Sequence, residues 1–182
     1  MVDYKKTALV LIDLQKGILS MDSFPHSSDE IIKNAEKLIT NFRKNNGFIA
    51  FVRVKFHDGQ DALKPKLAEQ SLPGKPDGDF SDFPANFNVS EADYVINKKG
   101  FSAFFGTDLD LQLRRRGIEN IILGGISTHI GVDTTARDAY QHGYEQYFVT
   151  DVMSAPRVEL HNFSINNSFP IMGKTTSVDN LI

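Results

Sequence analysis

The sequence predicts an α/β fold, in which a parallel sheet of five to six strands with the order 3-2-1-4-5-6 is the middle layer of a three-layer α/β/α sandwich. Short apolar runs alternate along the chain with stretches of helical periodicity, which is the pattern of right-handed β-α-β crossovers. Residues 7–13 are a continuous apolar run that ends in a charge, as expected of a central strand buried on both faces. The chain of 182 residues is long enough for one such core, so we expect a single domain over residues 1–182.

The first half of the chain supplies two of the predicted strands and one long helix. The strand at residues 7–13 ends in Asp13, so we expect this carboxylate at the carboxyl edge of the sheet. Ser28 is expected to cap a helix, because apolar residues recur at helical spacing over residues 31–42. The second strand is predicted at residues 48–54.

Residues 55–93 predict a functional loop. They hold four of the seven prolines and three glycines, and they show no sustained helical or strand periodicity. A structureless stretch of this length inside a compact domain is usually functional. Half of the fourteen phenylalanines fall between Phe56 and Phe105, so we expect this part of the chain to fold back and wall an apolar pocket.

The second half repeats the alternation of strands and helices. Thr107 and Asp110 resemble a capping box at the start of a helix that ends near Gly117. Strands are predicted at residues 94–96, 121–123 and 145–151, a further helix at residues 159–166, and an edge strand at residues 172–177.

The segment between the fourth strand and the next helix is the most informative part of the sequence. Gly124 and Gly125 end the predicted strand, and apolar residues then recur at helical spacing from Val132 onward. The helix therefore begins between Thr128 and Gly131. A helix start presents unpaired N–H groups and the positive end of its dipole, so it favours a carboxylate, a carbonyl oxygen or an oxyanion.

Three candidate catalytic residues converge on one edge of the predicted sheet. In an open parallel sheet, ligands bind beyond the carboxyl ends of the strands where the strand order reverses. Here the reversal lies between the first and fourth strands. Asp13 ends the first strand, Gly131 begins the helix after the fourth, and Lys98 follows the third strand closely enough to reach across.

Composition argues against several classes of protein. The chain is 41% hydrophobic and 24% charged, with a net charge of −3 and no long apolar stretch, so we expect a cytoplasmic protein without a membrane partner. It has no basic stripe, which argues against nucleic acid. Cysteine is absent, so disulfides and thiolate chemistry are absent too. His57 and Asp58 have no second histidine nearby, so we predict no metal. We also predict no organic cofactor, and a small molecule as the substrate.

The chain also resembles a known family. Residues 125–139 are similar to the signature of the isochorismatase-like hydrolases, also called the cysteine hydrolase superfamily, whose turn usually carries a nucleophilic Cys at the position of Gly131. Residues 11–15 match the first-strand motif of the family with its Asp, and Lys98 matches its Lys. The resemblance covers about residues 7–177 and implies an isochorismatase-like, Rossmann-like sandwich.

The resemblance also implies roles for individual residues. Asp13 would move protons, Lys98 would stabilise negative charge, and a cis peptide after Ile126 would direct the turn at the substrate. A homo-oligomer is expected because family members often are oligomers. The expected substrate-binding residues come from the turn and from the segment after Lys98, and they are Ile126, Ser127, Thr128, Phe101 and Phe104.

Glycine at position 131 shapes the expected chemistry, because it offers no nucleophile for covalent amide hydrolysis. Ser127, Thr128 and Thr134 are nearby hydroxyls, but the sequence places no His or Lys to activate them. Isochorismatases, whose turn is similar, cleave a vinyl ether without covalent catalysis. We therefore expect a hydrolase for a small carboxylate-bearing substrate that forms no thiol intermediate. The alternatives are a degenerate hydrolase that binds a ligand without turnover and an amidase with a water nucleophile.

Overall fold

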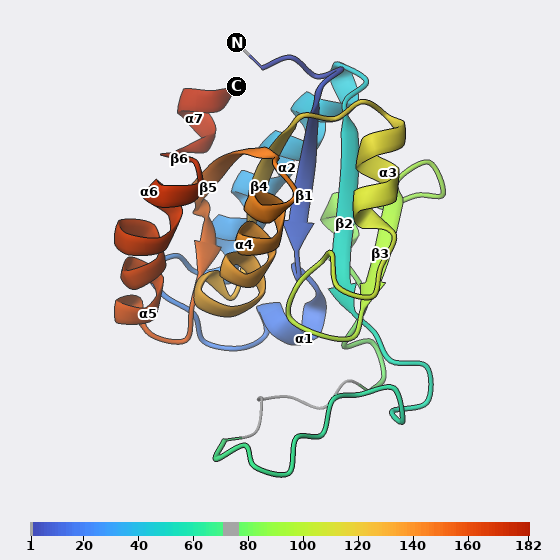
Figure 1. Ribbon diagram of the computed structural model, residues 1–182, viewed down its shortest axis with the longest axis vertical. Helices are drawn as coiled ribbons and strands as arrows, with labels where there is room; N and C mark the ends of the chain where they lie inside the picture. Colours follow the sequence, from blue (N-terminus) through green and yellow to red (C-terminus); the bar gives the residue numbers. More distant parts are fainter. Residues whose placement is uncertain (1, 71–76) are drawn as a thin grey trace.

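The computed structural model describes residues 2–70 and 77–182 of the chain. Within them, six strands form one parallel sheet in the order β3-β2-β1-β4-β5-β6, which confirms the predicted order (Figure 1). The strand order reverses between β1 and β4, which pair in the middle of the sheet. The strands are β1 (Thr7–Ile12), β2 (Phe48–Val54), β3 (Tyr94–Lys98), β4 (Asn120–Ile126), β5 (Glu145–Ser154) and β6 (Lys174–Thr176).

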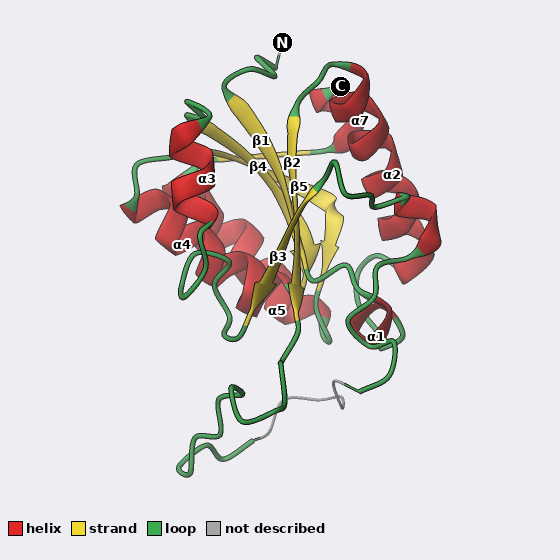
Figure 2. Ribbon diagram, turned by 90° about the vertical axis from the view of Figure 1, so that its right-hand side faces the viewer, coloured by secondary structure: helices red, strands yellow, loops and turns green. Residues whose placement is uncertain are grey.

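Helices cover both faces of the sheet, as expected for a three-layer sandwich (Figure 2). On one face lie α2 and α7, and on the other lie α3, α4 and α5. None of the helices within the described ranges is long and apolar enough to cross a membrane. The bounds of these helices and of the short α1 are α1 (Lys16–Leu19), α2 (Ser28–Lys44), α3 (Leu109–Arg115), α4 (Asp133–Gln141), α5 (Val158–Phe163) and α7 (Val178–Leu181).

The central strand β1 is buried along its whole length and contributes to the core on both faces of the sheet. Leu9 and Leu11 pack in the cluster that includes the buried side of α2. Ala8, Val10 and Ile12 pack in the cluster that includes the buried sides of α3 and α4. Burying one such large aliphatic side chain stabilises a protein by about 1.5–3 kcal/mol. The packing of β1 therefore fixes the position of Asp13, the residue that follows it.

The cap of α2 differs from the prediction by one residue. Ser27, not Ser28, caps the helix: its Oγ accepts from the Glu30 backbone N–H, and the Glu30 carboxylate accepts from the Ser27 N–H at 2.8 Å. Such a reciprocal pair requires a Glu or Gln three residues after the capping serine, and Ser27 has one in Glu30. The hydroxyl of Ser28 instead donates to the Leu19 carbonyl.

The predicted capping box of α3 does not form. The helix begins at Leu109, whose N–H donates to the Thr107 hydroxyl at 3.2 Å. The Asp110 carboxylate does not reach back to the helix start, because it accepts hydrogen bonds from Arg114 and from the Tyr144 hydroxyl.

Gly124 and Gly125 lie inside β4 and do not end it. A Cβ at Gly125 would lie 2.1 Å from the Ile12 carbonyl oxygen, and one at Gly124 would lie 3.0 Å from a methyl group of Val152. Gly125 also has a φ of 142°, which other residues rarely adopt. The glycines therefore allow neighbouring strands to approach closely, and β4 runs on to Ile126.

The last part of the chain is less regular than predicted. The helix expected at residues 159–166 begins as α5 but continues through η3 (Ser164–Ser168), a π-helical turn, into α6 (Phe169–Met172). The edge strand is present as β6, which is shorter than predicted. A second π-helical turn, η2 (Thr128–Val132), opens the helical segment that continues as α4.

The loop after β2 extends beyond the carboxyl ends of the strands (Figure 1). In the described part of residues 55–93, the one helical turn is η1 (Ala85–Phe87), and residues 71–76 of the predicted loop lie outside the described residues. The rings of Phe83 and Phe87 pack against Phe51, with ring centroids 5.5 and 6.3 Å apart. These two phenylalanines therefore belong to the core beneath α2 and not to the expected pocket wall.

Candidate active site

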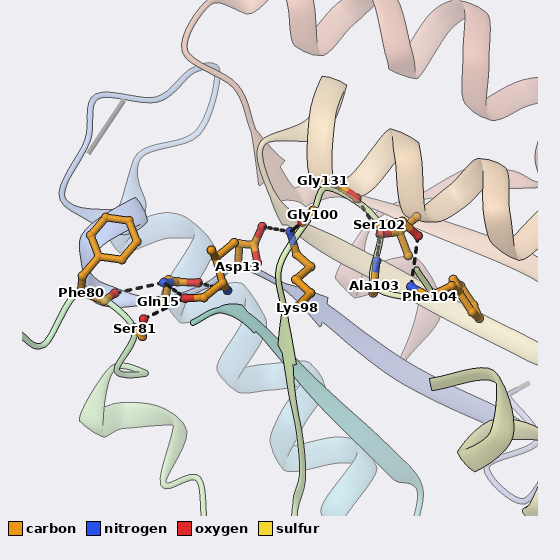
Figure 3. A network of polar contacts seen from close by, with 12 residues as sticks. Asp13, Gln15, Phe80, Ser81, Lys98, Gly100, Ser102, Ala103, Phe104 and Gly131 are labelled. Atoms are coloured by element: carbon orange, nitrogen blue, oxygen red, sulfur yellow. Dashed lines mark hydrogen bonds and ion pairs between the residues drawn. The ribbon is translucent and has the colours of Figure 1, made fainter. Parts of the chain in front are cut away.

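Asp13 follows β1 directly, and its backbone conformation carries its carboxyl group over the edge of the sheet. Its φ of 55° lies in the left-handed region, which costs a non-glycine residue on the order of 1–3 kcal/mol. The Asp13 N–H donates to the Val52 carbonyl at 2.9 Å, which ties this turn to the end of β2. The carboxyl group consequently lies among the residues that follow β3 and β4 (Figure 3).

Lys98 is the last residue of β3 and forms a buried ion pair with Asp13. Its Nζ lies 2.8 Å from Asp13 Oδ2 and also donates to the Gly100 carbonyl at 3.0 Å. The side chains of Lys98 and Asp13 are only 2% and 7% exposed. The second carboxylate oxygen, Asp13 Oδ1, is buried without a hydrogen-bond partner. A buried acceptor of this kind is costly in a folded protein unless a ligand or water completes it, so it marks a functional candidate.

The electrostatic setting of Asp13 contains two opposing effects. Burial disfavours the carboxylate and raises the pKa, whereas the Lys98 ammonium favours the carboxylate and lowers it. Burial is the larger effect, and the pKa of Asp13 is raised from 3.8 to about 6. The carboxyl group can therefore hold or release a proton close to neutral pH.

Gly131 lies directly against this carboxyl group. A Cβ at position 131 would lie 3.1 Å from Asp13 Oδ2, 3.1 Å from Ile12 Cγ2 and 3.7 Å from the Phe101 carbonyl oxygen. Gly131 belongs to η2, and its carbonyl accepts from the Thr135 hydroxyl at 2.7 Å. The structure thus brings together Asp13, Lys98 and Gly131 from three separate parts of the chain.

Comparison with known proteins identifies the family. The protein-family model for the isochorismatase domain matches residues 7–180 of this chain. The chain belongs to the isochorismatase family. It is 49% identical to the uncharacterized isochorismatase family protein YwoC of Bacillus subtilis, over all of this chain and 95% of that protein. It is 28% identical to the ureidoacrylate amidohydrolase RutB of Acinetobacter baylyi, over 98% of this chain and 83% of that protein.

Solved structures agree with this assignment. An isochorismatase family protein from Burkholderia thailandensis superimposes with a TM-score of 0.90 at 36% sequence identity, over 97% of this chain and 93% of that one. The parallel sheet with the order 3-2-1-4-5-6 and the flanking helices are therefore the isochorismatase-like α/β fold.

In this isochorismatase-family chain, Gln15 supports the site in a way that the sequence did not reveal. The side chain is fully buried; its amide donates to the carbonyls of Val54 and Phe80, and its oxygen accepts from the Val54 N–H at 2.7 Å (Figure 3). The Ser81 hydroxyl also donates to the Val54 carbonyl at 2.8 Å. Gln15 and Ser81 therefore attach residues 80–81 to the end of β2, beside Asp13.

The predicted substrate-binding residues divide into accessible and buried ones. Ser127 is partly exposed, and the peptide bond between Ile126 and Ser127 is cis. Phe101 is exposed, and its carbonyl oxygen faces Gly131. Ile126 and Thr128 are buried, so in this structure they support the turn and do not present their side chains to solvent.

Phe104 lies away from the site. Its ring packs against the rings of Tyr144 and His142, with centroids 6.0 and 5.1 Å apart, and it points away from the Asp13–Lys98 pair in Figure 3. The reason is that the segment after Lys98 turns into the layer of α3 and α4, where Phe104 completes the core. The structure therefore does not bring Phe104 to the substrate side.

One buried histidine near the turn was not anticipated. Thr128 Oγ1 lies 2.8 Å from Nδ1 of His161 in α5, so a hydroxyl of the turn does have an imidazole partner. The expectation that no His is placed beside these hydroxyls is wrong, because 33 residues separate the two in sequence and no spacing rule connects them. Burial, with a smaller contribution from His26, lowers the pKa of His161 to about 4.

The described residues contain no group of three or more His, Cys, Asp or Glu side chains that could hold a metal ion. The segment at His57 has a different role. The His57 backbone N–H donates to the Asp61 carboxylate, which also pairs with Lys99 at 3.0 Å.

Proposed function

We propose that the protein is a hydrolase that cleaves a small carboxylate-bearing substrate without a covalent thiol intermediate, and that the reaction is vinyl-ether hydrolysis, as in isochorismatase. The Asp13 carboxyl group carries this proposal. It is buried, its pKa is raised to about 6, and its Oδ2 lies 3.1 Å from where a side chain at position 131 would begin. A carboxyl group with a pKa near neutrality is suited to proton transfer.

The absence of a thiol supports a non-covalent reaction. Gly131 stands where the family usually carries its nucleophilic Cys, and the chain contains no cysteine elsewhere. Without a Cβ at position 131, the atoms nearest to Asp13 Oδ2 on this side are those of the Gly131 backbone, and no nucleophilic side chain lies there. Hydrolysis of a vinyl ether needs an acid and a water molecule, and Asp13 would be the acid.

The proposed reaction begins with the protonated Asp13 carboxyl group. It donates its proton to the terminal alkene carbon of the vinyl ether, and the electron pair of the C=C bond forms the new C–H bond. The ether oxygen shares the resulting positive charge as an oxocarbenium ion, and the Asp13 carboxylate stabilises this ion. Water adds to the cationic carbon and gives a proton to the Asp13 carboxylate, which restores the acid. The hemiketal then collapses to a ketone and an alcohol, and its hydroxyl proton passes to the departing ether oxygen.

Lys98 and the turn have supporting roles in this proposal. The Lys98 ammonium, 2.8 Å from Asp13 Oδ2, stabilises the carboxylate that forms when the proton leaves. The positive end of the helical segment that begins with η2 favours a substrate carboxylate. The partly exposed Ser127 and Phe101 are the predicted residues best placed to contact the substrate.

An amidase with a water nucleophile is the second candidate, because a relative at 28% identity is named a ureidoacrylate amidohydrolase. In that reaction Asp13 would have to be ionised to take a proton from water. The two candidates therefore require opposite protonation states of the same group. If Asp13 is the acid, kcat/KM falls as pH rises through about 6; if Asp13 is the base, kcat/KM rises over the same range.

The test is a pair of assays on wild type and Asp13→Asn, run from mildly acidic to mildly alkaline pH. Pyruvate release from isochorismate reports vinyl-ether cleavage, and ammonia release from ureidoacrylate reports amide cleavage. We expect pyruvate release that declines above about pH 6 and falls at least about a hundredfold in Asp13→Asn. Ammonia release that increases with pH would favour the amidase.

A protein that binds these compounds in a calorimeter but turns none of them over would be the degenerate binder. That third candidate rests on Gly131, which provides no nucleophile.

A further inference from the structure

A row of polar contacts, here called the polar seam, joins η2 and η3, the two π-helical turns in the described part of the chain. The helical segment η2–α4 is linked to the segment α5–η3 by three side-chain contacts. These contacts are Thr128 Oγ1 to His161 Nδ1 at 2.8 Å, Ser164 Oγ donating to Asp133 Oδ2 at 2.8 Å, and Arg137 donating to Ser168 Oγ at 3.0 Å. All of these residues except Arg137 are buried. π-Helical turns inside helices are uncommon and frequently mark functional sites.

The contact between Thr128 and His161 is the one nearest the candidate active site. Thr128 is fully buried, and His161 is 4% exposed. Because burial lowers the pKa of His161 to about 4, the imidazole is neutral at physiological pH, and His26 is the titratable group beside it. A neutral imidazole offers one donor and one acceptor nitrogen, and a hydroxyl can complement either. Removing one partner would leave the other buried and unsatisfied.

Thr128 is connected to the reacting centre through a single helical turn. It is the first residue of η2, and Gly131 follows three residues later in the same turn. Two N–H groups of this turn, those of Ile130 and Val132, both donate to the Ser127 carbonyl, so hydrogen bonds on either side of Gly131 hold the turn together. Gly131 is the residue of this turn that lies against Asp13 Oδ2.

We propose that Thr128 and His161 are positioning residues, which hold η2 against the Asp13 carboxyl group and thereby keep water away from it and fix where the substrate sits. Thr128 is not the nucleophile, because its hydroxyl is fully buried and directed at α5. The kinetic consequence rests on the proposed function. The structural consequence does not, because it concerns only the surroundings of Asp13, whose one charged partner in the structure is Lys98.

The experiment compares Thr128→Val, which removes the hydroxyl at nearly constant shape, with Thr128→Ser, which keeps it. The first measurement is the titration of the Asp13 side-chain carbon, followed by NMR in protein labelled with 13C. In wild type the midpoint should lie at about 6. In Thr128→Val it should move down toward that of an ordinary Asp, because η2 is no longer held and water reaches the carboxylate. Thr128→Ser should titrate like wild type.

The second measurement is steady-state kinetics on whichever substrate is turned over. Thr128→Val should lower kcat by about 10- to 100-fold with a smaller change in KM, because a misplacement of about 1 Å costs on that scale. His161→Phe should have the same effect. The double variant should be no worse than either single one, because both act through one contact. Ser168→Ala is the control. It removes the contact between Arg137 and Ser168, which of the three contacts is the one farthest along α4 from Gly131, and it should change neither measurement.

The inference is overturned if Thr128→Val or His161→Phe folds with an unchanged Asp13 midpoint. A covalent acyl group found on Thr128 by mass spectrometry would overturn it as well, since Thr128 would then be a nucleophile. If wild type turns over none of the substrates, the proposed function fails, but the NMR titration still decides the positioning role.

Discussion

At the scale of single residues, the candidate site depends on how one carboxyl group is protonated. Asp13 is held by a left-handed backbone conformation at the end of the most buried strand, and Lys98 reaches it from a strand two places away in the sheet. Burial and the ammonium group act on the pKa in opposite directions, and burial prevails. Sequence reasoning could name both residues, but not the balance of the two effects, which depends on how completely water is excluded.

Lys98→Met tests this balance, because methionine fills similar space without the charge. Removing the cation takes away the interaction that lowers the pKa of Asp13, so the acid should stay protonated to higher pH. The decline of kcat/KM should then move upward by at least about one pH unit. Lys99→Met is a matched control, since Lys99 is a neighbouring lysine that pairs with Asp61. A pH profile that is identical in wild type and Lys98→Met would show that the group controlling the rate is not Asp13.

Gly131→Cys tests whether the absence of a thiol at position 131 explains the expected lack of covalent amidase chemistry. A Cβ at this position would lie 3.1 Å from both Asp13 Oδ2 and Ile12 Cγ2, so these neighbours must yield by only a few tenths of an ångström. We expect the new thiol to react with iodoacetamide in the folded protein and to release ammonia from amides that wild type leaves intact. Gly131→Ala is the control, because it adds the Cβ without the sulfur. A folded Gly131→Cys variant with an unreactive thiol would count against the idea that this position faces the substrate.

At the scale of elements, the sequence predicted which segments are strands and helices better than where they end. The alternation of apolar runs was sufficient for the strands, because a parallel sheet buries them on both faces. The glycines before the turn were assigned to the end of a strand, whereas they allow β4 to pack closely against β1 and β5. Local sequence cannot distinguish these roles, since both require a residue without a side chain.

Gly125→Ala tests the close approach of β4 and β1. Its Cβ would lie 2.1 Å from the Ile12 carbonyl oxygen, and the backbone of β1 cannot yield as a flexible side chain could. We expect a loss of about 3 kcal/mol or more in the free energy of unfolding, at the upper end of what overpacking costs. Because Ile12 precedes Asp13, activity should fall as well. Gly143→Ala is the comparison: its φ of 83° is unfavourable but its surroundings are open, so it should cost about 1–2 kcal/mol. Urea unfolding of both variants gives the two values.

At the scale of the whole molecule, topology rules predicted the sheet order and the edge where the candidate site lies. In an open parallel sheet these rules leave few alternatives once the strands are known. Contacts between distant segments were not predictable. The pairing of Thr128 with His161 and the packing of Phe83 and Phe87 on Phe51 join residues whose separation in sequence carries no periodic signal. Sequence reasoning therefore predicts which residues converge at the candidate site, but not the contacts that support them.

The helices on the α4 side of the sheet carry exposed apolar side chains that could form the interface of the expected homo-oligomer. Tyr140 of α4, Phe163 of α5 and Ile171 of α6 are exposed large apolar side chains, and α4 contacts α6. Exposed apolar groups that gather on one side of a protein often mark an interface. We expect wild type to elute as a dimer or larger assembly at micromolar concentration, measured by light scattering after size-exclusion chromatography.

A charge placed on this surface should separate the assembly, because an unpaired ammonium group is costly in an apolar interface. Phe163→Lys combined with Ile171→Lys should therefore shift the protein to monomer. Leu67→Lys, on the exposed loop after β2, serves as the control and should leave the assembly intact. Phe163 and Ile171 are both exposed on the outside of the fold, so the unfolding transition of the double variant should change little. If wild type is already a monomer at this concentration, the expected oligomer is wrong and these side chains are ordinary exposed residues.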